Sequence, residues 1–234
     1  MIKRIFTLFI AFNLMACAEL QNVINDLPQG GGLSNADMAA GLRQALDFGI
    51  DKQVTKLTQR DGFYKNELVK ILLPEELQKV DNALRKVGLS SLADEGIKAL
   101  NRAAEDAVKE ATPIFVNAVK DITFNDAKNI LLGEDDAATN YLTSKTQTAL
   151  YNKFKPVISN SFGKVGADQI WTNLITKYNN LPLTNDVNPD LTDYVTTEAL
   201  EGVYTMIAVE EKEIRNKVSS RTTDLLKRVF ALQD

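Results

Sequence analysis

Histidine is absent from the 234 residues, and cysteine occurs only once, at position 17. Without histidine, the chain lacks the most frequent general base and the most frequent zinc ligand in proteins. A single cysteine can form neither an internal disulfide nor a CxxC redox pair. We therefore expect a protein without metal or cofactor, and not an enzyme. The alternative is catalysis by two carboxylates in a deep cleft, as in glycosidases.

Glycine and proline are also scarce, with 12 and 6 residues, and they fall between long periodic stretches. This distribution is typical of helices joined by short turns. Hydrophobic residues make up 44% of the chain and charged residues 25%, which are ordinary values for a globular protein. The chain is therefore long enough and apolar enough to bury a substantial core.

The first sixteen residues have the pattern of an export signal. Lys3 and Arg4 precede an apolar run, residues 5–12, that only Thr7 interrupts. This run is too short to cross a bilayer as a helix, which needs roughly 20 residues. A basic start, a short apolar centre and a small residue at the end are typical of a secretory signal. We predict that residues 1–16 are removed.

Cys17 follows this segment directly. Residues 14–17, Leu-Met-Ala-Cys, resemble the lipobox of bacterial lipoproteins, although Met15 stands where a small residue is usual. The resemblance implies that the Cys17 thiol carries diacylglycerol and that its new amino group is acylated. Ala18 favours sorting to the outer membrane, on its periplasmic face. The alternatives are an ordinary signal peptide with a chance cysteine, or a free buried thiol.

Removal of residues 1–16 takes away two basic residues, so the charge falls from −4 to 25 − 31 = −6. An acidic protein does not favour nucleic acid as a partner. Residues 17–33 contain Pro28 and three consecutive glycines, and we interpret them as a flexible lipid-anchored tether. A short helix over residues 19–27 is the alternative.

Residues 34–234 are expected to form one helical domain. Ser34 and Asp37 have the spacing of a helix N-cap and its acidic partner. Apolar residues then recur at intervals of three and four up to Leu57, until Asp61 and Gly62 break the pattern. No segment alternates strictly, so we predict an all-α, compact multi-helix bundle of about eight helices with essentially no sheet.

Further signals divide the rest of the domain. Several residue pairs are predicted to cap helices, and Pro156 is predicted to kink or end one. A helix is also expected between Pro74 and Gly88, and another from 167 to 178. The predicted capping positions are Thr112 before Pro113, Thr123 with Asp126, and Ser220 or Thr222 before the last helix.

Several short sequences occur in an order that resembles a known family. They are 61–63 (DGF), 73–74 (LP), 101–105 (NRAAE), 136–139 (DAAT), 205–208 (TMIA) and 221–227 (RTTDLLK). Together they resemble the bacterial family of exported helical proteins known as DUF4197, domain of unknown function 4197, over residues 34–231. The resemblance implies a helical fold and an envelope location. It implies no activity and no catalytic residue.

Three charged residues are candidates for ligand binding. Arg102 and Glu105 lie three apart on one helix face with alanines between them, which favours a partly buried pair. The pair would either bind an anion or a headgroup, or join two helices as a structural ion pair. Arg221 would either contribute to such a site or dock the last helix.

Two acidic clusters are weaker candidates for binding a metal ion. Residues 134–136 and Thr139 would bind a divalent cation or favour a helix start. Asp186, Asn188 and Asp190 alternate as in a calcium loop, but the turn glycine and the bidentate glutamate are missing. We interpret this loop as a helix cap. The acidic run 210–213 is interpreted as a solvated helix face.

Two functions follow from these expectations. The first is an envelope lipoprotein that binds another envelope protein or supports the envelope structurally, without catalysis. The second is a periplasmic protein that holds a small apolar ligand such as a fatty acid or phospholipid. The second requires an apolar cavity of several hundred cubic ångströms, with Arg102 or Arg221 near its mouth.

Overall fold

The computed structural model describes residues 33–74, 90–164 and 190–233, with a few single positions between these ranges. The described residues form seven α-helices and no strand, which confirms the predicted all-α class. The signal segment, Cys17 and the tether before residue 33 lie outside them. So do most of the helix predicted between 74 and 88 and the segments predicted between 165 and 189.

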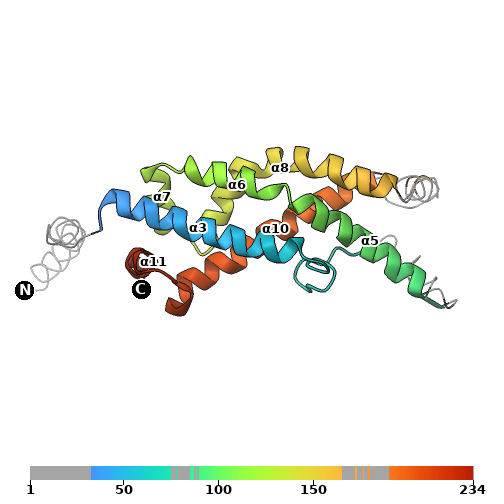
Figure 1. Ribbon diagram of the computed structural model, residues 1–234, viewed down its shortest axis with the longest axis horizontal. Helices are drawn as coiled ribbons and strands as arrows, with labels where there is room; N and C mark the ends of the chain where they lie inside the picture. Colours follow the sequence, from blue (N-terminus) through green and yellow to red (C-terminus); the bar gives the residue numbers. More distant parts are fainter. Residues whose placement is uncertain are drawn as a thin grey trace, which may run out of the picture.

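In chain order the helices are α3 (Asn35–Thr58), α5 (Ser90–Val108), α6 (Ala111–Lys120), α7 (Phe124–Leu131), α8 (Ala137–Gly163), α10 (Leu191–Asn216) and α11 (Asp224–Phe230), with 3-10 turns η1 (Val218–Ser220) and η2 (Ala231–Gln233). The longer helices, α3, α5, α8 and α10, run roughly along the long axis of the molecule, whereas α11 is seen end-on (Figure 1). Helix α10 packs against α8, α3 and α5, while α6 and α8 lie along one edge. None of the described helices has the length and apolar character needed to cross a bilayer.

Helix α3 begins where the sequence predicts. The hydroxyl of Ser34 accepts a hydrogen bond from the Asp37 N–H at 3.1 Å, and the Asp37 carboxylate accepts one from the Ser34 N–H at 3.0 Å. This reciprocal capping box satisfies two amides at the helix start. The apolar stripe of α3 that is buried in the core consists of Leu42, Ala45, Leu46, Ile50, Val54 and Leu57.

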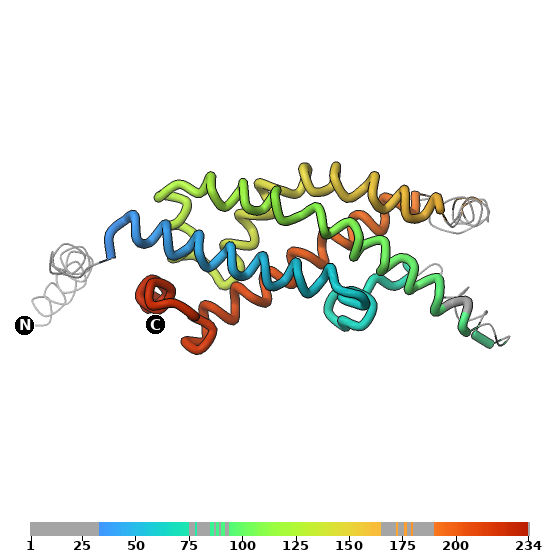
Figure 2. The backbone as a smooth tube through the Cα atoms, in the orientation of Figure 1, coloured from blue at the N-terminus to red at the C-terminus, as the bar shows by residue number. Residues whose placement is uncertain are grey.

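After α3 the chain turns sharply and enters a loop, residues 59–74. Asp61 has φ +70°, in the left-handed region. At Gly62 a side chain cannot fit, because a Cβ would lie 2.5 Å from the carbonyl oxygens of Lys56 and Leu57. The tube in Figure 2 shows this loop projecting from the body between the end of α3 and the start of α5.

Helix α8 does not end at Pro156, which was one of the two outcomes predicted for this proline. It runs without a break from Ala137 to Gly163, with the proline inside it on the exposed side. Phe154, Ile158 and Phe162 continue one buried stripe past the proline. Burial of this stripe offsets the backbone hydrogen bond that a proline cannot donate.

Two predicted caps are also wrong. Helix α6 starts at Ala111 rather than after Thr112, which places Pro113 in the first turn, where the amides have no helical partner. Helix α11 is capped by Thr223, whose hydroxyl accepts a hydrogen bond from the Leu226 N–H. The predicted Ser220 belongs instead to the preceding 3-10 turn.

Candidate functional site

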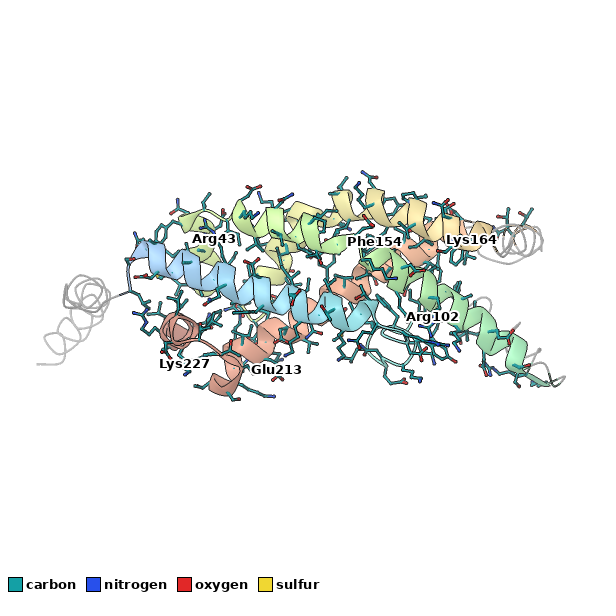
Figure 3. The ribbon with its side chains drawn as sticks, viewed as in Figure 1. Arg43, Arg102, Phe154, Lys164, Glu213 and Lys227 are labelled. Carbon is teal, nitrogen blue, oxygen red and sulfur yellow. The ribbon has the colours of Figure 1, made fainter. Side chains whose placement is uncertain are left out.

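Arg102 lies on α5 beside the loop that follows α3 (Figure 3). One guanidinium nitrogen lies 2.6 Å from a Glu105 carboxylate oxygen, and the other lies 2.6 Å from a carboxylate oxygen of Asp61. The hydrogen bond from Lys65 and the charge of Arg102 hold the pKa of Asp61 below its ordinary value. Arg102 and Glu105 are therefore joined, as predicted, but their third partner comes from the loop.

The same face of α5 binds the backbone of this loop. The second carboxylate oxygen of Glu105 accepts a hydrogen bond from the Phe63 N–H at 3.2 Å. Buried Asn101 accepts one from the Ile71 N–H and donates one to the Ile71 carbonyl, both at 2.8 Å. The cluster of Asn101, Arg102 and Glu105 thus fixes the loop at three residues, Asp61, Phe63 and Ile71.

Arg221 lies elsewhere in the fold and is buried. It donates hydrogen bonds to the carbonyls of Ile214 and Arg215, at the end of α10, at 3.1 and 2.7 Å. Its guanidinium also lies 6.0 Å from the ring centroid of Phe230 on α11. Arg221 therefore joins the end of α10 to α11, where a cation is favoured by the helix dipole. In the described part of the chain, Arg221 and Arg102 are not brought together.

The acidic run 210–213 is not wholly solvated, and the prediction is wrong for its first two members. Glu210 and Glu211 are each only 7% exposed. Glu210 accepts hydrogen bonds from Lys52 at 2.7 Å and Gln53 at 2.6 Å, both on α3. The sequence spacing could have predicted this burial, because Glu210 lies three residues after the core residue Ile207 and four before Ile214.

Glu211 and Arg215 join two helix ends. The Glu211 carboxylate accepts hydrogen bonds from the N–H groups of Ala138 and Thr139, both at 2.8 Å, at the start of α8. Arg215 donates to the Ile130 carbonyl, at the end of α7, also at 2.8 Å. A negative charge at the start of a helix and a positive charge at its end both interact favourably with the helix dipole.

This arrangement replaces the cap predicted from residues 134–136. Asp136 stands at the N-cap position of α8 but accepts no capping hydrogen bond with its side chain. Glu211 supplies the acceptor from α10 instead. Because the two segments are far apart in sequence, no local pattern could have identified this cap.

A small cavity lies beside this cluster, between α3, α10 and α11. Its volume is about 20 Å³, and Leu42, Ile207 and Phe230 are among the side chains that line it. Such a volume holds about one water molecule. An apolar ligand would need several hundred cubic ångströms, which this cavity does not provide. Because parts of the domain lie outside the described residues, the apolar-ligand hypothesis stays a prediction.

A larger open groove of about 600 Å³ follows the contact between α8 and α10. We call it the α8–α10 groove. Hydroxyl and amide side chains predominate along it, with Leu200 and Ala208 as apolar members and Asp136 and Glu201 as acids. Its uncharged polar members include Thr139, Asn140, Thr143, Gln147, Thr197 and Thr205.

Tyr151 lines one part of this groove and donates a hydrogen bond to Asp193. That bond raises the pKa of the Tyr151 phenol. Lys155 lies 3.1 Å from both the Tyr151 oxygen and an Asp190 carboxylate oxygen, and these hydrogen bonds raise the pKa of its ammonium group. Tyr151 therefore stays a protonated hydrogen-bonding group at neutral pH.

Asp190 also caps α10, since its carboxylate accepts the Asp193 N–H at 2.9 Å. The cap interpretation of this residue is confirmed, while Asp186 and Asn188 lie outside the described residues. In the described ranges, no three side chains of the types His, Cys, Asp and Glu are grouped so that they could hold a metal ion.

Comparison with known proteins agrees with the resemblance carried by the short sequences. No curated protein and no solved structure matches the chain. One family model does match it, over residues 32–231, which is most of its length. The chain therefore belongs to the family described as "Protein of unknown function (DUF4197)".

Proposed function

We propose that the chain is an envelope lipoprotein, anchored through lipid on Cys17 at the periplasmic face of the outer membrane. Its helical body would act as a non-enzymatic binding or structural module. Cys17 is the only cysteine and directly follows the basic and apolar segment. Helix α3 begins at Asn35, so a spacer separates the anchor from the body.

The non-enzymatic part of the proposal is supported by the structural role of the buried charged side chains. Within the described residues, five charged side chains are buried, and each bonds to groups of the fold itself. Catalytic sites typically hold ionisable groups in a cleft, where burial and neighbouring charges tune their protonation. Here the buried charges cap helices, bind a loop or pair with one another. The five are Glu105, Glu210, Glu211, Arg215 and Arg221.

The α8–α10 groove is the face that best suits a partner. Its threonine, asparagine and glutamine side chains can donate and accept hydrogen bonds, as a polar segment of another protein requires. Leu200 and Ala208 offer apolar contact between them. We assign this groove to a segment of another envelope protein.

Intact mass spectrometry of the native protein, extracted with detergent, tests the anchor. We expect Cys17 as the first residue, with a mass increased by its acyl chains, and loss of that increase in Cys17→Ser. A native protein that keeps residues 1–16, or that carries no acyl chain, would contradict the lipoprotein assignment.

Site-specific photo-crosslinking in intact cells tests the groove. Asn140 and Asn152 are both exposed on α8, but only Asn140 lines the groove. A crosslinking residue at 140 should capture a discrete protein partner, whereas the same residue at 152 should not. Equal capture at both positions, or none at 140, would reject this face. A fatty acid or phospholipid that co-purifies in native mass spectrometry would instead support the apolar-ligand hypothesis.

A further inference from the structure

Two leucines of the loop after α3 are held outside the core. Leu68 is 63% exposed and Leu72 is 50% exposed, while Val69 and Ile71 between them are buried. Burial alternates along residues 68–72, because Lys70 between Val69 and Ile71 is only half-buried. Leu68, Leu72 and part of Lys70 therefore lie on the outer side of the loop, and Val69 and Ile71 face the core.

The loop is fixed in this orientation. The backbone of Ile71 is bonded to Asn101, the backbone of Phe63 is bonded to Glu105, and Asp61 is bonded to Arg102. The inner positions are already filled, so the leucines cannot enter the core without breaking these bonds. Their exposure belongs to the folded state and is not a fluctuation of a loose loop.

Basic and aromatic side chains lie close together in this loop and on α5. The ammonium group of Lys70 lies 4.8 Å from the ring centroid of Tyr64, and that of Lys98 on α5 lies 5.9 Å from the same centroid. The loop, residues 59–74, contains three basic and two acidic residues, in a chain whose net charge is −4. With Lys98 of α5 beside Tyr64, this region carries more positive than negative charge in an acidic protein.

Leucine, lysine and tyrosine together form a surface suited to a lipid–water interface. Leucine enters the acyl region, lysine keeps its ammonium at the headgroups, and tyrosine places its ring between them. Anionic headgroups attract basic residues with about 1 kcal/mol for each one near the surface. We propose that Leu68 and Leu72 insert into an anionic lipid surface while Lys70 and Lys98 bind its headgroups.

This contact would be a second attachment of the lipoprotein proposed above. Helix α3 has 24 residues, so it places the loop about 36 Å from its own start, at 1.5 Å per residue. The tether predicted for residues 18–33, sixteen residues long, would span roughly 20–25 Å. A lipid on Cys17 and the loop can therefore reach one bilayer when α3 lies along its surface.

Spin labels on the full-length chain test the contact. In a Cys17→Ser background, Leu68→Cys and Leu132→Cys each leave one thiol for labelling. Leu132 is the matched control, because it is 65% exposed but is followed by the acids Glu134, Asp135 and Asp136. The probes are vesicles of phosphatidylcholine, alone or mixed with phosphatidylglycerol, with oxygen and a water-soluble nickel chelate as relaxation agents.

With phosphatidylglycerol present, we expect the label at 68 to be shielded from nickel and accessible to oxygen, and the label at 132 to stay accessible to nickel. Lys70→Gln combined with Lys98→Gln should lower the immersed fraction, relative to the water-exposed one, about thirtyfold, at about 1 kcal/mol for each basic residue. Lys145→Gln with Lys153→Gln makes the same change in net charge on α8 and should leave the label at 68 immersed.

A label at 68 that stays accessible to nickel on anionic vesicles would overturn the proposal. Equal immersion in neutral vesicles would also overturn it, because the lysines would then have no role. A label shielded in native membranes but exposed on vesicles would assign the loop to a protein partner instead. A failure of lipidation would appear in the mass of the native protein and would leave this depth measurement unaffected.

Discussion

Glu211 and Arg215 form an ion pair of 2.8 Å inside the fold, one helical turn apart on α10, and each also bonds to the end of a different helix. Both side chains are buried, so each charge depends on the other and on these backbone groups. The pair therefore fixes the corner between α7 and α8.

Removal of one member of this pair should destabilise the protein strongly. Arg215→Met leaves the Glu211 carboxylate buried without its cation, so the free energy of unfolding should fall by roughly 3–5 kcal/mol. The double variant with Glu211→Gln should lose less than the sum of the two single variants. Urea unfolding followed by helical circular dichroism measures both, and the exposed Lys212→Met is the control. A loss no larger than that of the control would show that the pair is dispensable.

The capping box of α7 should make stability depend on pH in acid. The Thr123 hydroxyl and N–H donate to the Asp126 carboxylate at 2.7 and 2.9 Å, and these bonds lower its pKa in the folded state. A lowered pKa stabilises the fold above the ordinary aspartate value, and this contribution is lost as the pH falls through the folded-state value.

Asp126→Asn should therefore lose roughly 0.5–1 kcal/mol at neutral pH, and its difference from the native chain should vanish in strong acid. Urea unfolding at a series of pH values gives this difference. Asp121→Asn removes the same charge outside the box and serves as control. A difference that stays constant over the whole acid range would argue against the carboxylate's role.

Close packing of α3 on α11 should make Gly41 intolerant of a side chain. A Cβ at this position would lie 2.6 Å from a methyl carbon of Val229, whereas a Cβ at Gly96 in α5 would meet no atom within 4 Å. Gly41→Ala should destabilise the fold by about 1–3 kcal/mol through overpacking. Gly96→Ala should stabilise it by roughly 0.5–1 kcal/mol, because alanine is the better helix former. Thermal unfolding compares the two, and a stable Gly41→Ala protein would mean that α11 packs differently.

Asn101 should control the order of the loop after α3. Asn101→Ala leaves the N–H and carbonyl of buried Ile71 without their partner, which costs about 1–3 kcal/mol for each group. Hydrogen exchange should become faster in peptides that cover residues 63–71 and stay unchanged in α8. Asn117→Ala on α6, at an exposed position, is the control. Unchanged exchange around Ile71 would mean that other contacts hold the loop.

Local spacing predicted the parts of the fold whose bonds are local. The capping boxes at Ser34 and Thr123 join residues three apart in the chain. The sequence spacing therefore identifies both partners of each hydrogen bond directly. The Arg102–Glu105 pair was predicted on the same basis. Asp61, its third partner, lies 41 residues from Arg102, and no local pattern contains that contact.

Two of the wrong predictions share a physical cause. A proline was expected to kink or end a helix from its own chemistry, but the helix continues because Phe154 and Ile158 pack in the core on either side of Pro156. The run at Glu210 was judged by its charge and not by its helical phase, which places it on the apolar face. In both cases burial against distant helices outweighed local preference.

The cap that Glu211 provides has a consequence for the order in which the chain can fold. The first amides of α8 find their acceptor 72 residues further along the chain, in the Thr139–Glu211 bond. During synthesis, this corner cannot close until nearly the whole polypeptide has emerged. The growing chain therefore cannot complete its bundle early. A truncated product that lacks α10 would leave the first amides of α8 without this acceptor.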